Sequence, residues 1–313
     1  MPLVTVQELI DAGVHFGHQA SRWNPKMKPF IRGKRHRIHV IDLEETVRGL
    51  YRACHFIRHI AATGAQIMFL GTKRQIRAVV LAEAQRCGMP AVTERWIGGT
   101  LTNFATVRER LSRLEELEAM EASGVMEKFK KKNQASLRRE MGKIRRNLEG
   151  VRQLYGLPGA LVVVDPRRED NCIREARRMN VPVVAILDTD CDPASADIAI
   201  PANDDAMSSV QLLLSRIADA VLEGRAGLDE GVLMEAQRAA KEDVRIREVQ
   251  GRRSTQAAAA GGGGPRRGGG RGRGGSRFVE RGPQAEHVSI GGTAAPPAES
   301  GESAPPADGA PAS

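Results

Sequence analysis

Two short apolar runs separated by an amphipathic segment constrain the fold of this chain more than any other feature. Residues 160–164 read Ala-Leu-Val-Val-Val and end at Asp165, and residues 181–187 end at Asp188. Runs this short and this rich in β-branched residues are typical of strands buried on both faces. Residues 171–179, between them, have apolar residues on one side only, which predicts a helix. A strand, a crossover helix and a second strand almost always form a right-handed parallel unit, so an α/β fold is expected.

Similar patterns continue on either side of this unit. Three further strands are predicted, the last of them a short edge strand, at residues 38–43, 66–70 and 197–201. Apolar spacing or capping residues predict four further helices, at residues 4–13, 44–63, 71–84 and 207–224. Alternating strands and helices predict a doubly wound parallel sheet. We expect its core to comprise residues 1–102 and 156–227.

The pattern changes between residues 103 and 155, where no strand is predicted. Apolar residues recur every three or four positions in both halves of this segment, and Ser123-Gly124 interrupts them. This predicts an inserted antiparallel helical hairpin with a coiled-coil seam. Residues 103–122 hold three bases and five acids, whereas residues 126–153 hold ten bases and three acids. The two halves can neutralise each other in part, but the basic excess favours a side that faces phosphates.

The C-terminal part of the chain differs in composition. Residues 228–250 are predicted to form an exposed, weakly amphipathic helix. Residues 252–281 hold eight arginines in a Gly-rich setting, and residues 282–313 hold four acids and no Lys or Arg. Such a segment cannot bury a core, so a disordered tail is expected at 251–313. Its Arg-Gly part suits loose RNA contact or a solubilising role.

Charge and cysteine content narrow the functional classes. The chain has 313 residues, a net charge of +9 and a pI near 9.8, which favours an anionic partner. The four cysteines show no paired CxxC spacing, so neither a zinc ribbon nor a disulfide framework is expected. The sequence shows no secretion signal and no apolar run of membrane-spanning length. A cytoplasmic protein without a membrane partner is therefore expected.

An acid-free basic segment lies near the N-terminus. Between Asp11 and Asp42 the sequence holds seven Lys or Arg residues and no Asp or Glu, and Trp23 and Phe30 stand among them. Cations that neutralise phosphates, together with flat rings, are typical of surfaces that follow an RNA backbone. A solvated basic loop with two core aromatic residues is the alternative that this segment alone leaves open.

Further basic positions extend the candidate RNA surface. The turn at Gly71 follows a predicted strand and can present free amides to an anion, although a plain tight turn is favoured. Basic residues of the hairpin are additional candidates. The predicted RNA-binding residues are Arg22, Trp23, Asn24, Lys26, Lys28, Arg32, Lys34, Arg35, Lys73, Arg74, Arg95, Asn103, Lys130, Lys131, Lys132, Arg138 and Arg139.

Carboxylates follow the predicted strands. The carboxyl ends of parallel strands meet at one edge of a doubly wound sheet, where ligands bind. The aspartates of that edge are Asp165, Asp188, Asp190, Asp192, Asp204 and Asp205. They can hold Mg²⁺, act as an acid–base pair, or form ordinary turns. The sequence has no Walker loop, dinucleotide fingerprint or nucleophile elbow. A nucleotide- or metal-dependent α/β enzyme is thus the less favoured class, and no catalytic residue is assigned.

Four motifs give the chain a specific resemblance to a known family. They are HFGHQ…RWNPKMKPFI…IHVIDL, then WIGGTLTNF, then the strand–helix–strand unit with Asp-Pro, Glu175 and Asn-Val-Pro, and finally CDPASADIAIPANDDA. Together they span residues 3 to about 225 and resemble the ribosomal protein S2 family of the small ribosomal subunit. The basic hairpin within an α/β core resembles the bacterial branch of that family.

The resemblance implies a flavodoxin-like fold and a structural role without catalysis, a small-molecule substrate or a required cofactor. The implied partners are 16S ribosomal RNA and other small-subunit proteins, including ribosomal protein S1, which the protein would help to anchor for translation. By matching motifs, it also implies a zinc pocket of His18, Asp188, Asp204 and Asp205. His18 follows a glycine, so its loop can approach closely, and His and Asp are suitable zinc ligands. A packed or hydrogen-bonded histidine is the alternative.

Overall fold

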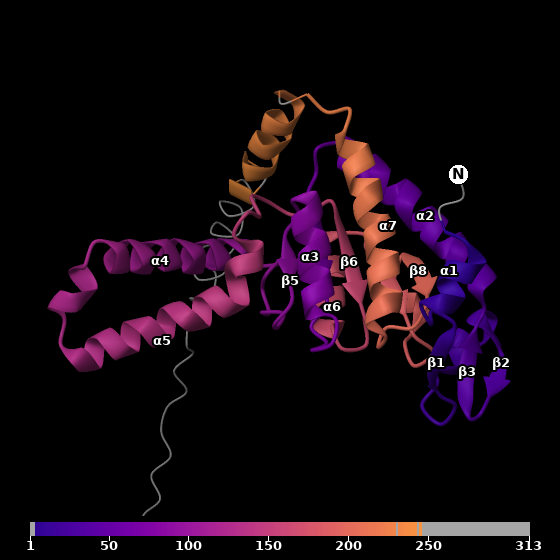
Figure 1. Cartoon of the computed structure of the whole chain (residues 1–313). Coiled ribbons are helices and arrows are strands. Elements are labelled where there is room, and N and C mark those ends of the chain that lie inside the picture. Colours follow the sequence, from indigo (N-terminus) through magenta and orange to yellow (C-terminus); the bar gives the residue numbers. More distant parts are fainter. Residues whose placement is uncertain (1–3, 230, 243, 246–313) are drawn as a thin grey trace, which may run out of the picture. The chain divides into compact units, whose positions relative to one another are not determined.

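The centre of the protein is a parallel sheet of five strands. The structure, a computed structural model, describes residues 4–229, 231–242 and 244–245. The strands are β4 (Ile67–Leu70), β5 (Ala91–Val92), β6 (Ala160–Val164), β7 (Val183–Leu187) and β8 (Ile198–Pro201). They lie in the order β5-β4-β6-β7-β8, and Figure 1 labels β5, β6 and β8. Counted within this sheet the order is 2-1-3-4-5, which is that of flavodoxin-like doubly wound sheets. The predicted α/β class is confirmed, and β8 is an edge strand as the sequence predicts.

Helices cover both faces of this sheet because alternate strand residues point into two apolar cores. The helices are α1 (Val6–Asp11), α2 (Leu43–Ala62), α3 (Arg77–Cys87), α4 (Phe104–Ala122), α5 (Lys131–Leu148), α6 (Asp170–Met179) and α7 (Met207–Arg225). Ile67 and Phe69 of β4 face a core shared with α1, α2, α3 and α7. Met68 and Leu70 face a second core, shared with α6 and one end of α4 and α5. Strands buried on both sides read as continuous apolar runs, which is why β6 and β7 were recognisable in the sequence.

A second, antiparallel sheet precedes the parallel one in the chain. Its strands are β1 (Phe16–Gln19), β2 (Ile31–Arg35) and β3 (Ile38–Ile41), in the order β1-β3-β2, and η1 (Pro25–Phe30) is a 3₁₀ helix before β2. The strand predicted at 38–43 is therefore shorter, and its place in the parallel sheet is wrong. His36 and Arg37 have φ angles of 49° and 66°, and they form the two-residue turn that pairs β2 with β3. This local pairing keeps β3 out of the central sheet.

Helices α4 and α5 follow β5 in the chain and precede β6. In space the two helices lie side by side (Figure 1). Leu114, Leu117 and Met141 form a small apolar cluster between them, and Arg145 Nη2 lies 2.7 Å from Glu118 Oε1. The 3₁₀ helices η2 (Val125–Lys128) and η3 (Glu149–Val151) follow α4 and α5 respectively. Helices are thus present where the apolar spacing predicts them. The domain boundaries, 103–155 for the hairpin and 1–102 with 156–227 for the core, stay predictions.

The chain is helical again after α7, at residues 231–242 and 244–245. A Cβ atom added to Gly64 would lie 2.9 Å from the Ala236 Cβ, and one added to Gly156 would lie 2.7 Å from the Ala240 Cβ, so this helix packs closely on the core. Val244 is buried, whereas the other side chains of this helix are partly or fully exposed. The helix predicted at 228–250 extends beyond the described residues, and the tail predicted at 251–313 lies outside them. Among the described helices, none is long and apolar enough to cross a membrane.

Candidate functional site

Charged side chains meet at the carboxyl ends of the parallel strands, where doubly wound sheets bind ligands. Asp165 and Asp188 directly follow β6 and β7, and Asp204 and Asp205 come shortly after β8. Two cations join them, one from the turn after β4 and one from β1. These six residues are called the edge cluster: His18, Lys73, Asp165, Asp188, Asp204 and Asp205.

Gly17 allows His18 to reach this edge. A Cβ atom on Gly17 would lie 2.6 Å from Thr189 Cγ2, so β1 can approach the loop after β7 only with a glycine at this position. The His18 backbone N–H donates to Asp188 Oδ1 at 3.1 Å and to Thr189 Oγ1 at 3.0 Å. His18 Nδ1 lies 2.9 Å from Asp188 Oδ2, and Nε2 lies 3.5 Å from Asp205 Oδ2. The histidine ring is therefore held between two carboxylates.

Lys73 is the second cation of the edge cluster and contacts three of its carboxylates. Its Nζ lies 2.7 Å from Asp204 Oδ1, 2.9 Å from Asp205 Oδ1 and 3.1 Å from Asp165 Oδ2. The Lys73 side chain is 15% exposed and that of Asp204 is 0% exposed, so water screens this pair weakly. Among the described residues, neither Asp204 oxygen accepts a well-aligned hydrogen bond, so the contact with Lys73 is chiefly electrostatic. Asp165 reaches the ammonium from a left-handed backbone conformation (φ 60°), which is rare outside glycine.

These contacts shift the pKa values of the edge cluster. The hydrogen bond to Asp188 raises the pKa of His18 to about 9, although burial acts in the opposite direction. Burial raises the pKa of Asp204 to about 7, against the effect of the Lys73 ammonium. Burial disfavours the Lys73 ammonium, but Asp204 and Asp165 outweigh it, so the pKa of Lys73 is raised. At neutral pH two protonated cations therefore face the carboxylates.

The composition of the edge cluster fits a bound metal cation. One ligand atom from each of His18, Asp188 and Asp204 lies within 4.8 Å of the others, and Asp165, Cys191 and Asp204 form a second such group. Imidazole nitrogen with carboxylate oxygen is a donor set that zinc accepts. Asp204 Oδ2 is buried without a hydrogen bond from any described residue, so it is available as a ligand atom. The predicted residues therefore converge, with Asp205 beside His18, whereas metal binding itself stays a prediction.

The acid-free basic segment forms β1, η1, β2, β3 and the loops between them. All seven of its cations are exposed: Arg22, Lys26, Lys28, Arg32, Lys34, Arg35 and Arg37. Within the described part of the chain, Lys26 is the one member with an acidic partner, its Nζ lying 2.6 Å from Asp192 Oδ2. Trp23 is half-buried with its ring centroid 5.1 Å from that of His39, and Asn24 caps η1 by accepting from the Lys26 N–H at 3.0 Å. Six exposed cations are thus left without a carboxylate partner among these residues.

The other predicted RNA-binding residues are exposed, with one exception. The exposed ones are Arg74, Arg95, Asn103, Lys130, Lys131, Lys132, Arg138 and Arg139; Lys130 precedes α5, and the four after it lie in the first half of that helix. Lys73 is the exception, because its ammonium is held by three carboxylates of the edge cluster. The position of Lys73 counts against the predicted RNA contact. In the sequence, Lys73 and its neighbour Arg74 are both basic residues of one turn, so both were predicted to bind RNA. The strand order would have shown that Lys73 faces carboxylates. Because β4 and β6 are neighbours, the turn after β4 lies next to Asp165 at the end of β6.

One buried carboxylate, to which sequence reasoning gave no role, organises the WIGGTLTNF loop. Glu175 of α6 accepts from Trp96 Nε1 at 3.0 Å and from the backbone N–H groups of Gly99 and Leu101 at 2.8 and 3.0 Å. The backbone N–H and the hydroxyl of Thr102 approach it at 3.3 Å. Glu175 is 8% exposed, and these donors satisfy the oxygens of a buried carboxyl group. They fix the loop on α6.

Fold and site together define a Rossmann-like α/β protein with a charged strand-end cluster and a separate basic surface. A family model described as ribosomal protein S2 matches residues 9–224. The small ribosomal subunit protein uS2c of Rhodomonas salina is 51% identical over 227 residues, which cover 72% of this chain and 93% of that protein. The uS2 protein of Rhodopirellula baltica is 51% identical over 220 residues, covering 70% and 85%. The uS2c protein of Guillardia theta is 46% identical over 227 residues, covering 72% and 97%.

The chain belongs to the ribosomal protein S2 family. The resemblance drawn from its four motifs is therefore confirmed. Proteins of this family are structural components of the small ribosomal subunit rather than enzymes.

Proposed function

We propose that the chain binds 16S ribosomal RNA through its N-terminal basic segment, as a cytoplasmic constituent of the small subunit in bacteria. The observation that carries this proposal is the run of exposed cations at residues 12–41, where no acid interrupts the sequence. A backbone of phosphates is the partner that such a surface fits, because each neutralised phosphate releases a counterion. No cofactor is needed for this role.

The hairpin supplies a second basic surface in this proposal. Lys130, Lys131, Lys132, Arg138 and Arg139 are exposed on the first turns of α5 or just before them. Arg138 Nε lies 3.8 Å from Glu121 Oε1, so the acids of α4 neutralise only part of this charge. We also propose that α4 and α5 pack as an antiparallel coiled coil; the buried Leu114, Leu117 and Met141 support this.

Salt dependence tests the RNA proposal. Replacing Arg22, Lys26, Lys28, Arg32 and Lys34 by Ala should weaken binding to 16S ribosomal RNA and flatten the plot of log affinity against log salt, by up to about one phosphate contact per residue. The matched control removes five exposed arginines elsewhere, from α2 and α6: Arg48, Arg52, Arg58, Arg174 and Arg178. Equal slopes for the two variants would refute the proposal.

We further propose that the edge cluster helps to anchor ribosomal protein S1 and takes zinc when it does so. His18, Asp188, Asp204 and Asp205 would hold the ion, which would supply a positive charge that fixes the His18 loop to the sheet edge. The His18 proton and the Lys73 ammonium partly neutralise these carboxylates in the structure, and metal binding has to release the proton from His18.

Metal content and S1 retention test this second proposal. His18→Ala should lower the zinc content of purified protein and loosen S1 from small subunits, while binding to ribosomal RNA is unchanged. His59→Ala is the control, because His59 is exposed near the end of α2 and outside the edge cluster. Zinc-free wild-type protein that still retains S1 would end the metal proposal.

A further inference from the structure

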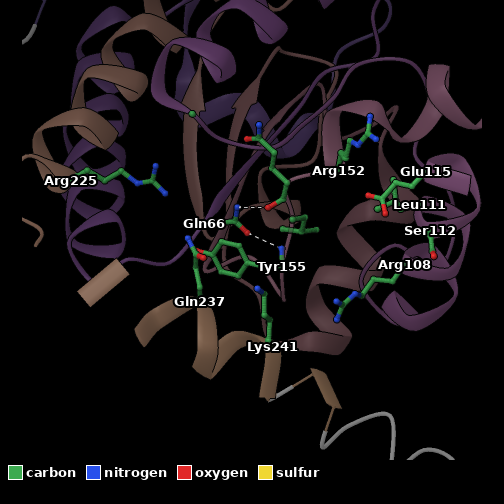
Figure 2. A pocket seen from close by; sticks show the side chains of 13 residues that line it. Gln66, Arg108, Leu111, Ser112, Glu115, Arg152, Tyr155, Arg225, Gln237 and Lys241 are labelled. Carbon is green, nitrogen blue, oxygen red and sulfur yellow. Dashed lines mark hydrogen bonds between the residues drawn. The ribbon is translucent and has the colours of Figure 1, made fainter. Parts of the chain in front are cut away.

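A cleft on the side of the sheet opposite to the edge cluster has no role in the functions above. It has a volume of about 670 Å³ and lies between α4, the segment after η3, the end of α7 and the helix at 231–242 (Figure 2). Its floor is fixed by Gln66, whose Nε2 donates to the Gln153 carbonyl at 2.9 Å and whose Oε1 accepts from the Tyr155 N–H at 3.2 Å. The Tyr155 hydroxyl in turn donates to the Gly64 carbonyl at 3.2 Å. These hydrogen bonds pre-form the floor of the cleft. The volume of the cleft falls within the ~300–1,000 Å³ that is typical of small-molecule sites.

The charge that lines this cleft is strongly positive. Arg108, Arg152, Arg225 and Lys241 line it, and Glu115 is the one carboxylate among the described residues that do so. Each cation comes from a different part of the chain, and Figure 2 shows them on different sides of the space. We call Arg108, Arg225 and Lys241 the cleft cations.

The cleft cations have no acidic partner among the described residues, which sets them apart from Arg152. Arg152 Nη2 lies 2.7 Å from Glu118 Oε2, and Nη1 lies 3.5 Å from Glu149 Oε1. Arg225 Nε, by contrast, is buried and has no hydrogen-bond partner within that part of the chain. Unneutralised cations that face one cleft also repel one another until an anion enters.

The side chains of the cleft suit phosphate oxygens. Guanidinium groups give planar, paired N–H donors that match phosphate oxygens, and a lysine adds a point charge. Ser112 and Gln237 line the same space and add a hydroxyl and an amide. The volume exceeds that of a single phosphate, so it suits a diphosphate or triphosphate with part of the molecule that carries it.

We propose that this cleft is a binding site for phosphate oxyanions, and that the favoured ligand is a small molecule bearing a diphosphate or triphosphate. The site is separate from the N-terminal basic segment, since none of its lining residues lies between residues 12 and 41. A backbone phosphate of RNA would supply the same chemistry and is distinguished by the experiment.

The test uses the full chain and inorganic pyrophosphate as the probe, with binding measured by calorimetry at constant ionic strength. The cleft variant combines Arg108→Gln, Arg225→Gln and Lys241→Gln. The control variant combines Arg110→Gln, Arg178→Gln and Arg238→Gln, which removes the same charge from exposed positions that do not line the cleft; Arg110 and Arg238 lie on the same two helices as Arg108 and Lys241. Melting temperatures of both variants check that they fold.

The expected result is that pyrophosphate binds the wild type and the control variant alike, and binds the cleft variant at least about ten-fold more weakly. A parallel titration uses a short single-stranded RNA. If the RNA alone loses affinity in the cleft variant, the phosphate source is RNA, and the phosphate chemistry of the cleft still holds. If neither probe distinguishes the cleft variant from the control variant, the proposal is overturned.

Discussion

At the scale of single residues, His18 has two states that exclude each other. Its ring forms an ion pair with Asp188 when it is protonated, and the pKa of that ring is raised to about 9. Zinc takes imidazole only in its neutral form. Metal binding must therefore break an ion pair that stabilises the metal-free protein, and zinc affinity should rise with pH up to about 9.

Stability against pH checks the state of His18. A pKa raised from 6.5 to about 9 on folding means that the ion pair stabilises the fold fully below pH 6.5 and is lost as the pH rises through about 9. His18→Gln should cost about 1.5–3 kcal/mol in metal-free protein below pH 6.5, and progressively less above it. Urea denaturation of both proteins in chelator across this range measures the difference. A difference independent of pH would contradict the assignment.

The residues of the edge cluster differ in how far sequence could predict them. His18, Asp188, Asp204 and Asp205 followed from matching motifs, and the structure brings them together. Lys73 could not be assigned, because a lysine beside an arginine looks the same in sequence whether it faces solvent or three carboxylates. Only the strand order, which places the turn after β4 next to the end of β6, separates the two cases.

At the scale of elements, the contacts that join α4 and α5 contribute unequally to the stability of the hairpin. Glu118 pairs with Arg145 and Arg152, but all three side chains are partly exposed, so water screens these pairs and they add little to the stability of the hairpin. Leu114 and Leu117 are fully buried between the helices. Apolar packing, rather than charge pairing, therefore holds the hairpin together.

A single substitution tests that ranking. Leu117→Ala should destabilise the hairpin by about 2–5 kcal/mol, because it leaves a cavity in a cluster that has few other members. Amide hydrogen exchange should accelerate within α4 and α5 and remain slow in β4, β6 and β7. Val125→Ala, at a side chain that is 38% exposed, is the control. Faster exchange throughout the sheet would show that the hairpin and the core unfold together.

Among the elements, burial decided which could be predicted. The strands β6 and β7 are buried along their whole length and gave plain apolar runs. By contrast, β1 and β2 are largely exposed, carry basic residues and look like loops. The two residues of β5 are too few for any period. The pairing of β1, β2 and β5 depends on neighbouring strands whose positions in space cannot be read from the sequence.

At the scale of the whole molecule, a packed residue lies next to the end of the described chain. Val244 is 5% exposed and belongs to the second core, and everything beyond residue 245 lies outside the described residues. Deleting the chain after Gly251 keeps Val244 and its contacts. We therefore expect a melting temperature within a few degrees of that of the full chain, because the Gly-, Ala- and Pro-rich composition of the deleted part buries little.

Calorimetry of the truncated and full chains measures this, and RNA titration of both separates two roles for the Arg-Gly part. Lower RNA affinity at unchanged stability would support an RNA contact. A truncation that ends before the helix at 231–242 is the control, since it removes Ala236 and Ala240 from Gly64 and Gly156 and should lower the melting temperature. A large drop for the first truncation would instead mean that the removed part docks on the core.

The insertion of the hairpin also sets the order in which a nascent chain can mature. β4 pairs with β6, from Ile67 and Ala160 to Leu70 and Val163, yet α4 and α5 are synthesised between them. The hairpin is held by contacts that are local in the sequence, so it can form early. The sheet cannot form the β4–β6 pair until β6 has been synthesised. Until then β4 has an unpaired edge between two apolar faces, the condition in which emerging chains aggregate or recruit chaperones. Proteolysis of ribosome-bound chains that end before and after Val164 would reveal the period in which β4 lacks its partner. This period would be shorter if β4 and β6 followed each other without an inserted hairpin.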